Sequence, residues 1–347
     1  MIEAIDLFCG VGGLTAGLQQ AGIKVKAGFD IEETCRFPFE FNNDSLFIKR
    51  DVSLLNKEEI STLYDDSKIR LLAGCAPCQP FSKYNQGKDT STDQKWPLLY
   101  SFARLIQEIN PELVTMENVP EVTKHKVYKD FVNELESQGY FIWADSVKCV
   151  DYGLPQQRRR HVLLASRLGE IKLIPPTHTK DNWITVKDVI SHLPPIKAGE
   201  TCSTDPLHRA MALSEINLKR IKASKQGGTW RDWPEDILAE CHKKPSGSTY
   251  SSVYGRMSWN RPSPTMTTLC YGYGNGRFGH PEQDRAISLR EAAIFQSFSE
   301  NYQFIKEGET PSLNTVGKMI GNAVPVILGK IIGQSFISHL QEISDIR

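Results

Sequence analysis

The chain has 347 residues, which is enough to bury a full core and to form one large domain with a smaller one. Lys and Arg number 41, Asp and Glu also number 41, and the formal net charge of +0 by itself indicates no class of partner. Eight scattered cysteines favour a reducing, cytoplasmic compartment and argue against a disulfide framework.

A strand, a glycine loop and a helix are predicted at the start. The strand at 4–8 contains Asp6 and runs into Cys9-Gly-Val-Gly-Gly13, before a helix at 14–21. With this opening, and with no apolar run long enough to span a bilayer, neither a secretory signal nor a membrane anchor is expected. The loop has neither the GxGxxG nor the GxxxxGK[ST] pattern, so it suits a ligand without a pyrophosphate. A tight turn alone would also explain it.

Two acids follow the next two strands. Asp30 ends a strand predicted at 25–29, and Asp51 follows a third short strand. At the carboxyl ends of strands, Asp30 could accept hydrogen bonds from ribose hydroxyls and Asp51 one from an adenine amino group. Both acids could instead be helix caps. Together with the glycine loop they favour a pocket for an adenosine without phosphates, and S-adenosylmethionine is the common cofactor of that kind.

After a fourth strand, Pro77 and Pro80 flank Cys78. The prolines restrict the backbone, so that the Cys78 thiol can be presented as a nucleophile at the open end of a sheet. Three alternatives stay open: a small buried apolar residue, a redox pair with Cys75, and half of a zinc site. No second ligand pair follows at zinc spacing, and no metal site is predicted. If the redox alternative is wrong, Cys75→Ala is expected to be nearly silent.

A polar stretch at 83–95 has the composition of a lid, and a helix at 97–109 and a strand at 113–116 follow it. That strand ends in Glu117. A carboxylate in such a buried place is costly to ionise unless it has a partner, which favours a role as an acid. A turn cap is the alternative.

A helix at 127–138 and a strand at 141–149 lead to the pattern QxRxR at Gln156, Arg158 and Arg160. Alternation before the apolar run at 162–165 is expected to place both arginines on one face of a strand. There they could bind an anion or the carbonyl edge of a base. A solvated basic patch is the alternative.

Regular spacing fades between 171 and about 260, where Pro and Gly pairs recur and Trp and Tyr alternate with basic residues. From Lys172 to Arg261 there are fourteen Lys and Arg against nine Asp and Glu. This composition predicts a loop-rich second domain with a nucleic-acid surface, although most of its tryptophans should be core. Helices are expected at 289–298 and 326–340.

With these blocks in order, the chain resembles the cytosine-carbon-5 DNA methyltransferase family from end to end. Each block alone is modestly specific, whereas the ordered set with a variable segment before RPSPT is highly specific. The family commonly has Glu where this chain has Asp30, which shortens the reach to ribose without changing the chemistry. The blocks are DLFCGVGG, FDIE, RDV, GCAPCQPFS, MENVP, QxRxR, RPSPTMTT and GNAVP.

The resemblance implies an α/β fold: a doubly wound, Rossmann-like, S-adenosylmethionine-dependent methyltransferase sheet with a smaller loop-rich target-recognition domain. Residues 1–170 plus 285–347 would form the catalytic domain, in which 314–338 folds back beside the first strand. Residues 171–284 would read the DNA sequence.

The resemblance also implies a reaction and its residues. Cys78 would add to carbon 6 of a flipped cytosine, Glu117 would bind ring nitrogen 3, and Arg158 and Arg160 would favour the thiolate and the charge on the ring. The loop at 79–95 would close over the base. The cofactor residues would be Phe8, Gly10, Val11, Gly13, Asp30, Ile31, Asp51, Val52, Pro77, Leu98 and Asn322. The substrate-binding residues would be Gln79, Ser82, Asn118, Gln156 and Thr265.

The expected partners are double-stranded DNA and a cognate restriction endonuclease encoded separately, for a cytoplasmic protein that acts as a monomer. Methylation of a tRNA cytosine, DNA binding without catalysis, and CxxC redox chemistry are the alternatives. The target sequence cannot be read from the residues, because recognition depends on loop contacts and on DNA deformation.

Overall fold

The computed structural model describes residues 1–66, 68–77, 97–248 and 251–346. The expectations for Cys78, Gln79, Ser82 and the stretch at 83–95 lie outside these residues. The chain divides into two compact units. Unit 1 comprises Met1–Tyr152, Arg159–Pro176 and Val324–Arg347, and unit 2 comprises Gly153–Arg158 and Thr177–Ala323.

Unit 1 is built on a sheet of seven strands, and every strand and helix expected for it among the described residues is found. Most ends lie within a few residues of the expected ones, whereas the last helix runs to Ile346 instead of 340. The strands are β1 (Ile2–Leu7), β2 (Lys24–Asp30), β3 (Leu46–Lys49), β4 (Ile69–Gly74), β5 (Leu113–Asn118), β6 (Phe141–Lys148) and β7 (Arg159–Ser166). The helices are α1 (Gly13–Gln20), α2 (Arg36–Asn42), α3 (Lys57–Ser61), α4 (Pro97–Ile109), α5 (Lys126–Ser137) and α12 (Val326–Ile346).

The strand order is β3-β2-β1-β4-β5-β7-β6. Strands β1 to β5 run parallel, whereas β7 is antiparallel to both β5 and β6. The chain leaves β1 for β2 on one side and later returns to pair β4 on the other, so the strand order reverses beside β1. In open α/β sheets, ligands bind outside the carboxyl ends of the strands at such a point. The expected α/β fold is confirmed.

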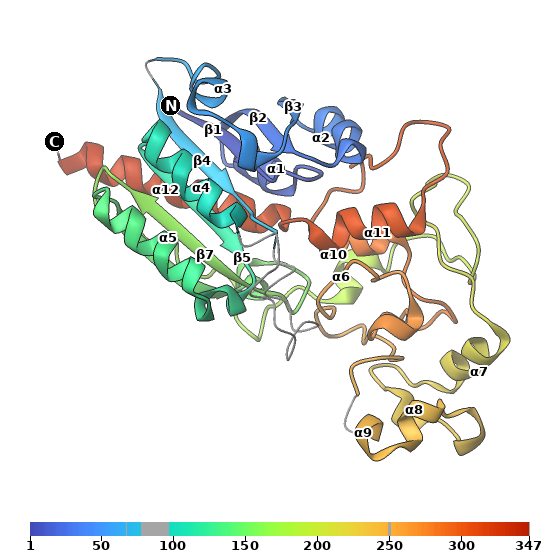
Figure 1. Cartoon of the computed structure of the whole chain (residues 1–347). Helices are drawn as coiled ribbons and strands as arrows, with labels where there is room; N and C mark the ends of the chain where they lie inside the picture. The colour runs from blue at the N-terminus through green and yellow to red at the C-terminus, as the bar shows by residue number, and fades with distance from the viewer. Residues whose placement is uncertain (67, 78–96, 249–250, 347) are drawn as a thin grey trace. The chain divides into compact units, whose positions relative to one another are not determined.

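Helices cover both faces of the sheet, which explains why every residue of β1 is buried (Figure 1). Side chains of Ile5 and Leu7 join the apolar core that α4 and α5 complete. The side chain of Asp6 points to the opposite face, where it accepts a hydrogen bond from Thr15 of α1.

Helix α12 packs closely on α1. A Cβ placed on Gly17 would lie 2.2 Å from the carbonyl oxygen of Val326, so only glycine allows this approach. The expectation that no apolar segment could span a bilayer needs a correction. By length and composition Leu313–Asp345 qualifies, but its helices are interrupted at Ala323–Pro325 and 67% of its most apolar window is buried, as in a core helix.

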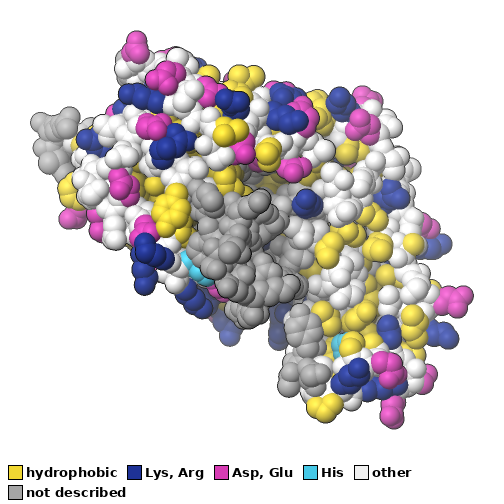
Figure 2. All heavy atoms as spheres, viewed as in Figure 1, with side chains coloured by type: hydrophobic (Ala, Val, Ile, Leu, Met, Phe, Trp, Pro, Cys, Tyr) yellow, Lys and Arg dark blue, Asp and Glu magenta, His cyan; other side chains and the backbone are white. Residues whose placement is uncertain are grey.

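Unit 2 consists mainly of loops around short helices, and its aromatic residues form a core. Trp230 and Trp233 are each 6% exposed and pack around His242, so they cannot stack on nucleic-acid bases. The prediction of core tryptophans is confirmed for these two. Basic and acidic side chains are mixed around α8 (Figure 2). The helices are α6 (Val186–Ile190), α7 (Glu215–Ala223), α8 (Glu240–Lys243), α9 (Pro245–Ser248), α10 (Leu289–Phe295) and α11 (Leu313–Asn322).

The compact units divide the chain at other places than the expected domains. The segment 285–323, which holds α10 and α11, clusters with unit 2, and Gly153–Arg158 does so as well. Buried hydrogen bonds of Gln156 and Arg158 join these segments. Helix α12 belongs to unit 1.

Candidate active site

The glycine loop after β1 holds an unusual backbone. Phe8 has φ 60°, in the left-handed region that non-glycine residues rarely adopt, and Gly10 and Gly12 have φ 52° and 87°. The backbone N–H of Gly10 donates to Oδ2 of Asp30 at 2.8 Å, which fastens the loop to the end of β2. Such strained residues persist only where the surrounding structure holds them, and they cluster at ligand sites.

Asp30 and Asp51 lie at the ends of neighbouring strands and accept hydrogen bonds from different groups. The second oxygen of Asp30 accepts from the N–H of Glu32 at 2.9 Å. Burial raises the pKa of Asp30, and the N–H donors of Glu32 and Gly10 oppose that rise. Asp51 caps the short helix at 52–54 through Oδ1, which accepts from the N–H of Ser53. Asp51 therefore caps this short helix through one of its two oxygens.

The geometry around the reversal point in the strand order fits an adenosine without phosphates. The left-handed glycines leave no Cβ in the way of a ligand at the loop, and Ile31, 58% exposed, offers an apolar side chain at the end of β2. Among the other expected cofactor residues, Val11 and Val52 are buried, Gly13 begins α1, Pro77 and Leu98 are half-buried, and Asn322 is exposed at the end of α11 in unit 2.

Asp6 is a buried residue to which the sequence analysis gave no role. Its Oδ2 accepts a hydrogen bond from Thr15 Oγ1 at 2.7 Å. Burial raises its pKa to about 7, the hydrogen bond from Thr15 opposes this, and the negative charge of Asp30 adds to it. A charged residue inside an otherwise apolar strand was the available signal. Asp6 thus carries a proton that an exposed aspartate would have lost.

The free energy of unfolding of Asp6→Asn is expected to rise relative to that of the wild type as pH rises from 5 to 8, by up to about 3 kcal/mol. The folded protein keeps the Asp6 proton up to about pH 7, whereas the unfolded chain loses it near pH 3.8, so wild-type stability falls across this range. Urea unfolding at several pH values measures the effect, with exposed Asp44→Asn as control. Identical pH slopes in Asp6→Asn and wild type would contradict the assignment.

Glu117 is the next-to-last residue of β5, and its carboxylate is nearly buried, 3% exposed, between two partners from other segments. The Sγ of Cys75, just after β4, donates to its Oε2 at 2.7 Å. The Nε of Arg160, on β7, lies 2.8 Å from its Oε1 without the direction of a hydrogen bond, so that contact is an ion pair. The structure thus brings a carboxylate, a guanidinium and a thiol together. The thiol belongs to Cys75, which precedes Cys78 by three residues in the sequence.

The expectation that Arg158 and Arg160 share one face of a strand is wrong. Strand β7 begins at Arg159, and Arg158 lies before it in unit 2, 2% exposed. Its guanidinium donates to the backbone carbonyls of Met266, Gly321 and Ala323. Alternation on a strand could not reveal carbonyl partners more than 100 residues away. Arg158 therefore holds the turn on either side of Asn322.

Three expected substrate-binding residues have structural partners. Gln156 is fully buried and bonds Phe295, Gln296 and Met266. Asn118 donates to the carbonyl of Ala76, which ties the end of β5 to the loop after β4, and Thr265 donates to the carbonyl of Gln157. Their side chains shape the surrounding loops.

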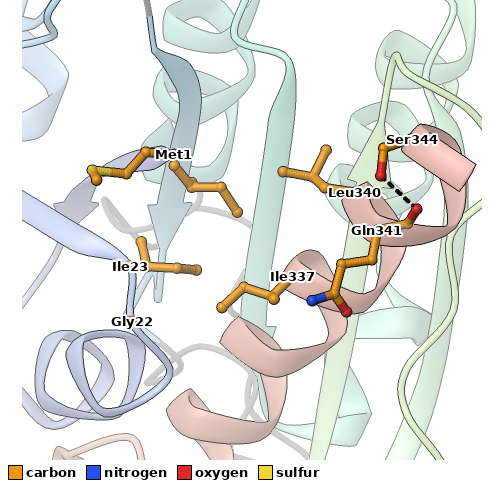
Figure 3. Close-up of a pocket in the computed structure, with 8 residues that line it drawn as sticks. Met1, Gly22, Ile23, Ile337, Leu340, Gln341 and Ser344 are labelled. Atoms are coloured by element: carbon orange, nitrogen blue, oxygen red, sulfur yellow. Dashed lines mark hydrogen bonds between the residues drawn. The ribbon is translucent and has the colours of Figure 1, made fainter.

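A pocket of about 240 Å³ lies away from these residues, between the amino end of β1 and α12 (Figure 3). Ile23, Ile337 and Leu340 point into it. Its lining carries no ionisable side chain, so it offers no chemistry that would compete with the strand ends. The lining residues are Met1, Ile2, Gly22, Ile23, Ile337, Leu340, Gln341 and Ser344.

Known proteins match the chain along nearly its whole length. A model of the family described as C-5 cytosine-specific DNA methylase matches residues 2–338. Type II methylase M.HgiDII of Herpetosiphon aurantiacus is 51% identical, over 99% of this chain and 98% of that protein. Type II methyltransferase M1.HphI of Haemophilus parahaemolyticus is 30% identical, over 96% and 86%. A solved prophage-encoded DNA modification methyltransferase of E. coli shares the fold, with a TM-score of 0.74 at 23% identity over 98% of this chain and 100% of that one.

Proposed function

The chain belongs to the C-5 cytosine-specific DNA methylase family, and from this premise we propose that it methylates carbon 5 of a cytosine flipped out of duplex DNA, through a covalent adduct with Cys78. The observation that carries the proposal is the buried carboxylate of Glu117, with Arg160 and the thiol of Cys75 against it, at the carboxyl ends of β5 and β4 and the amino end of the antiparallel β7. This set supplies a proton donor and a cation beside the loop that leads to Cys78.

The chemistry requires such a set. Carbon 5 of cytosine is a poor nucleophile, so the thiolate of Cys78 first adds to carbon 6. Arg160 would hold the ring carbonyl at position 2, and Glu117 would place a proton at ring nitrogen 3, which stabilises the adduct as an enamine. Methylation at carbon 5, loss of the proton there and expulsion of Cys78 complete the turnover. Arg158 would contribute indirectly, because it binds the backbone carbonyls of Gly321 and Ala323.

S-adenosylmethionine would supply the electrophilic methyl group as a sulfonium. The fit of the glycine loop, Asp30 and Ile31 to an adenosine supports this cofactor. Phe8 and Gly10 would line it through the strained backbone after β1, and Asp51 and Val52 would lie at its adenine edge. By the family resemblance, Asn322 at the end of α11 would also be a cofactor residue.

The biological setting is proposed from the relatives, whose names describe Type II methylases. The enzyme would protect cytoplasmic DNA from a restriction endonuclease encoded separately, and it would act as a monomer. Residues 171–284 would read the target sequence through exposed loops, since Trp230 and Trp233 are buried.

Incubation with a duplex DNA library, tritiated S-adenosylmethionine and, in parallel, DNA containing 5-fluorocytosine tests the proposal. Fluorine cannot leave carbon 5 as a proton does, so the wild type is expected to remain covalently attached on a denaturing gel. Cys78→Ala should form no adduct and transfer no methyl group, yet bind DNA. Turnover in that variant would exclude Cys78 as the nucleophile, and label on tRNA with none on DNA would favour the RNA alternative.

A further inference from the structure

Cys75 contacts the proposed acid and is held rigidly where it does so. Its Sγ lies 2.7 Å from Oε2 of Glu117, 42 residues further along the chain. Its backbone N–H donates to the carbonyl of Leu7 at 3.2 Å, which continues the pairing of β4 with β1 beyond the last strand residue. The thiol is thus fixed beside the reversal point in the strand order by the sheet itself.

The two oxygens of Glu117 differ in their partners. Oε1 is buried and lies beside the Arg160 guanidinium without hydrogen-bond geometry. The charge of Arg160 therefore attracts the carboxylate but does not fix the orientation of the carboxylate group. Oε2 receives the directional bond from Cys75. Within the part of the chain that the structure describes, Cys75 is therefore the donor that orients this carboxylate.

We infer that Cys75 is a positioning residue for Glu117, whose thiol sets the orientation of the carboxylate that meets ring nitrogen 3 of the target cytosine. The inference rests on the proposed function. It predicts a loss of activity in Cys75→Ala, whereas the sequence predicted almost no effect of that change. The prediction from the sequence considered only redox and zinc roles for Cys75.

A thiol can set the direction of this carboxylate. An S–H group is a weak but directional donor, and a serine hydroxyl in its place could donate in the same way. Among the residues that the structure describes, Arg160 from β7 is the charged group that faces Glu117. The next residue on β7, His161, is hydrogen-bonded to Tyr128, and burial lowers its pKa to about 4, so it is neutral at working pH.

Cys75→Ala and Cys75→Ser test the inference, because alanine removes the orienting bond whereas serine keeps a donor at that position. Single-turnover methyl transfer to duplex DNA carrying the target would be measured with tritiated S-adenosylmethionine. In Cys75→Ala the maximal rate should fall about tenfold as the orienting bond is lost. In Cys75→Ser the hydroxyl can still donate to Oε2, so the rate should recover to within about threefold of the wild type.

Cys202→Ala is the matched control, since Cys202 is also half-buried but lies in unit 2 beside Thr204. It should keep the wild-type rate, and all variants should keep their unfolding midpoints and affinities for DNA. A wild-type rate in Cys75→Ala, or equal rate losses in Cys75→Ala and Cys75→Ser, would overturn the inference alone. A wild type that neither labels DNA nor forms an adduct would overturn the proposed function and the inference with it.

Discussion

Glu117→Gln is expected to slow methyl transfer by about a hundredfold to ten-thousandfold, while duplex DNA still binds. The amide matches the carboxyl group in size but cannot give up a proton to ring nitrogen 3. It also carries no charge for Arg160, whose Nε lies 2.8 Å from the carboxylate oxygen. Both losses fall on the step in which charge develops on the ring.

Single-turnover rates and the yield of the 5-fluorocytosine adduct would measure this effect. Glu136→Gln, an exposed change on α5, is the control and should match the wild type. The unfolding midpoint should stay unchanged, because the Arg160 side chain is 14% exposed to solvent, and this result would show that the loss is chemical. Methyl transfer at the wild-type rate in Glu117→Gln would remove Glu117 from the mechanism.

The fold could be predicted because its signals are local. Strands β1, β2 and β5 are short and largely apolar, and each ends in or beside a residue with a distinct chemistry, namely Gly10, Asp30 and Glu117. The strand order then brings those ends to one edge of the sheet. Periodicity and loop residues thus indicated both the architecture and the edge at which the candidate site lies.

Partners that meet only in three dimensions could not be predicted. The contact of Cys75 with Glu117 depends on the register of β4 with β5, and Arg158 finds its acceptors in segments more than 100 residues away. Asp51 looked equally suited to cap a helix or bind a ligand, because the local pattern is the same in both cases. The burial of Trp230 depends likewise on the packing of unit 2.

Glu291→Gln is expected to lower the free energy of unfolding by about 3–5 kcal/mol at pH 7. Glu291 and Arg285, 1% and 0% exposed, form two parallel hydrogen bonds of 2.7 Å inside unit 2. The variant would leave the guanidinium buried without a countercharge. Urea unfolding measures the loss, with exposed Glu282→Gln as control. The double variant R285M/E291L should regain most of it, because an apolar pair needs no charge compensation.

The pH dependence of this loss identifies its cause. Burial by itself would raise the pKa of Glu291, but the charge and hydrogen bonds of Arg285 lower it to about 2, against 4.5 for an ordinary glutamate. The stabilisation is therefore complete above pH 4.5 and disappears as pH falls towards 2, about 3 kcal/mol in all.

His280, 3.7 Å from Glu291, has a pKa lowered by burial to about 4, so it destabilises both the wild type and Glu291→Gln below pH 6.5. The stability curves of wild type and Glu291→Gln should thus converge below pH 4.5. A difference that stays constant down to pH 3 would mean that packing, and not charge, accounts for the loss.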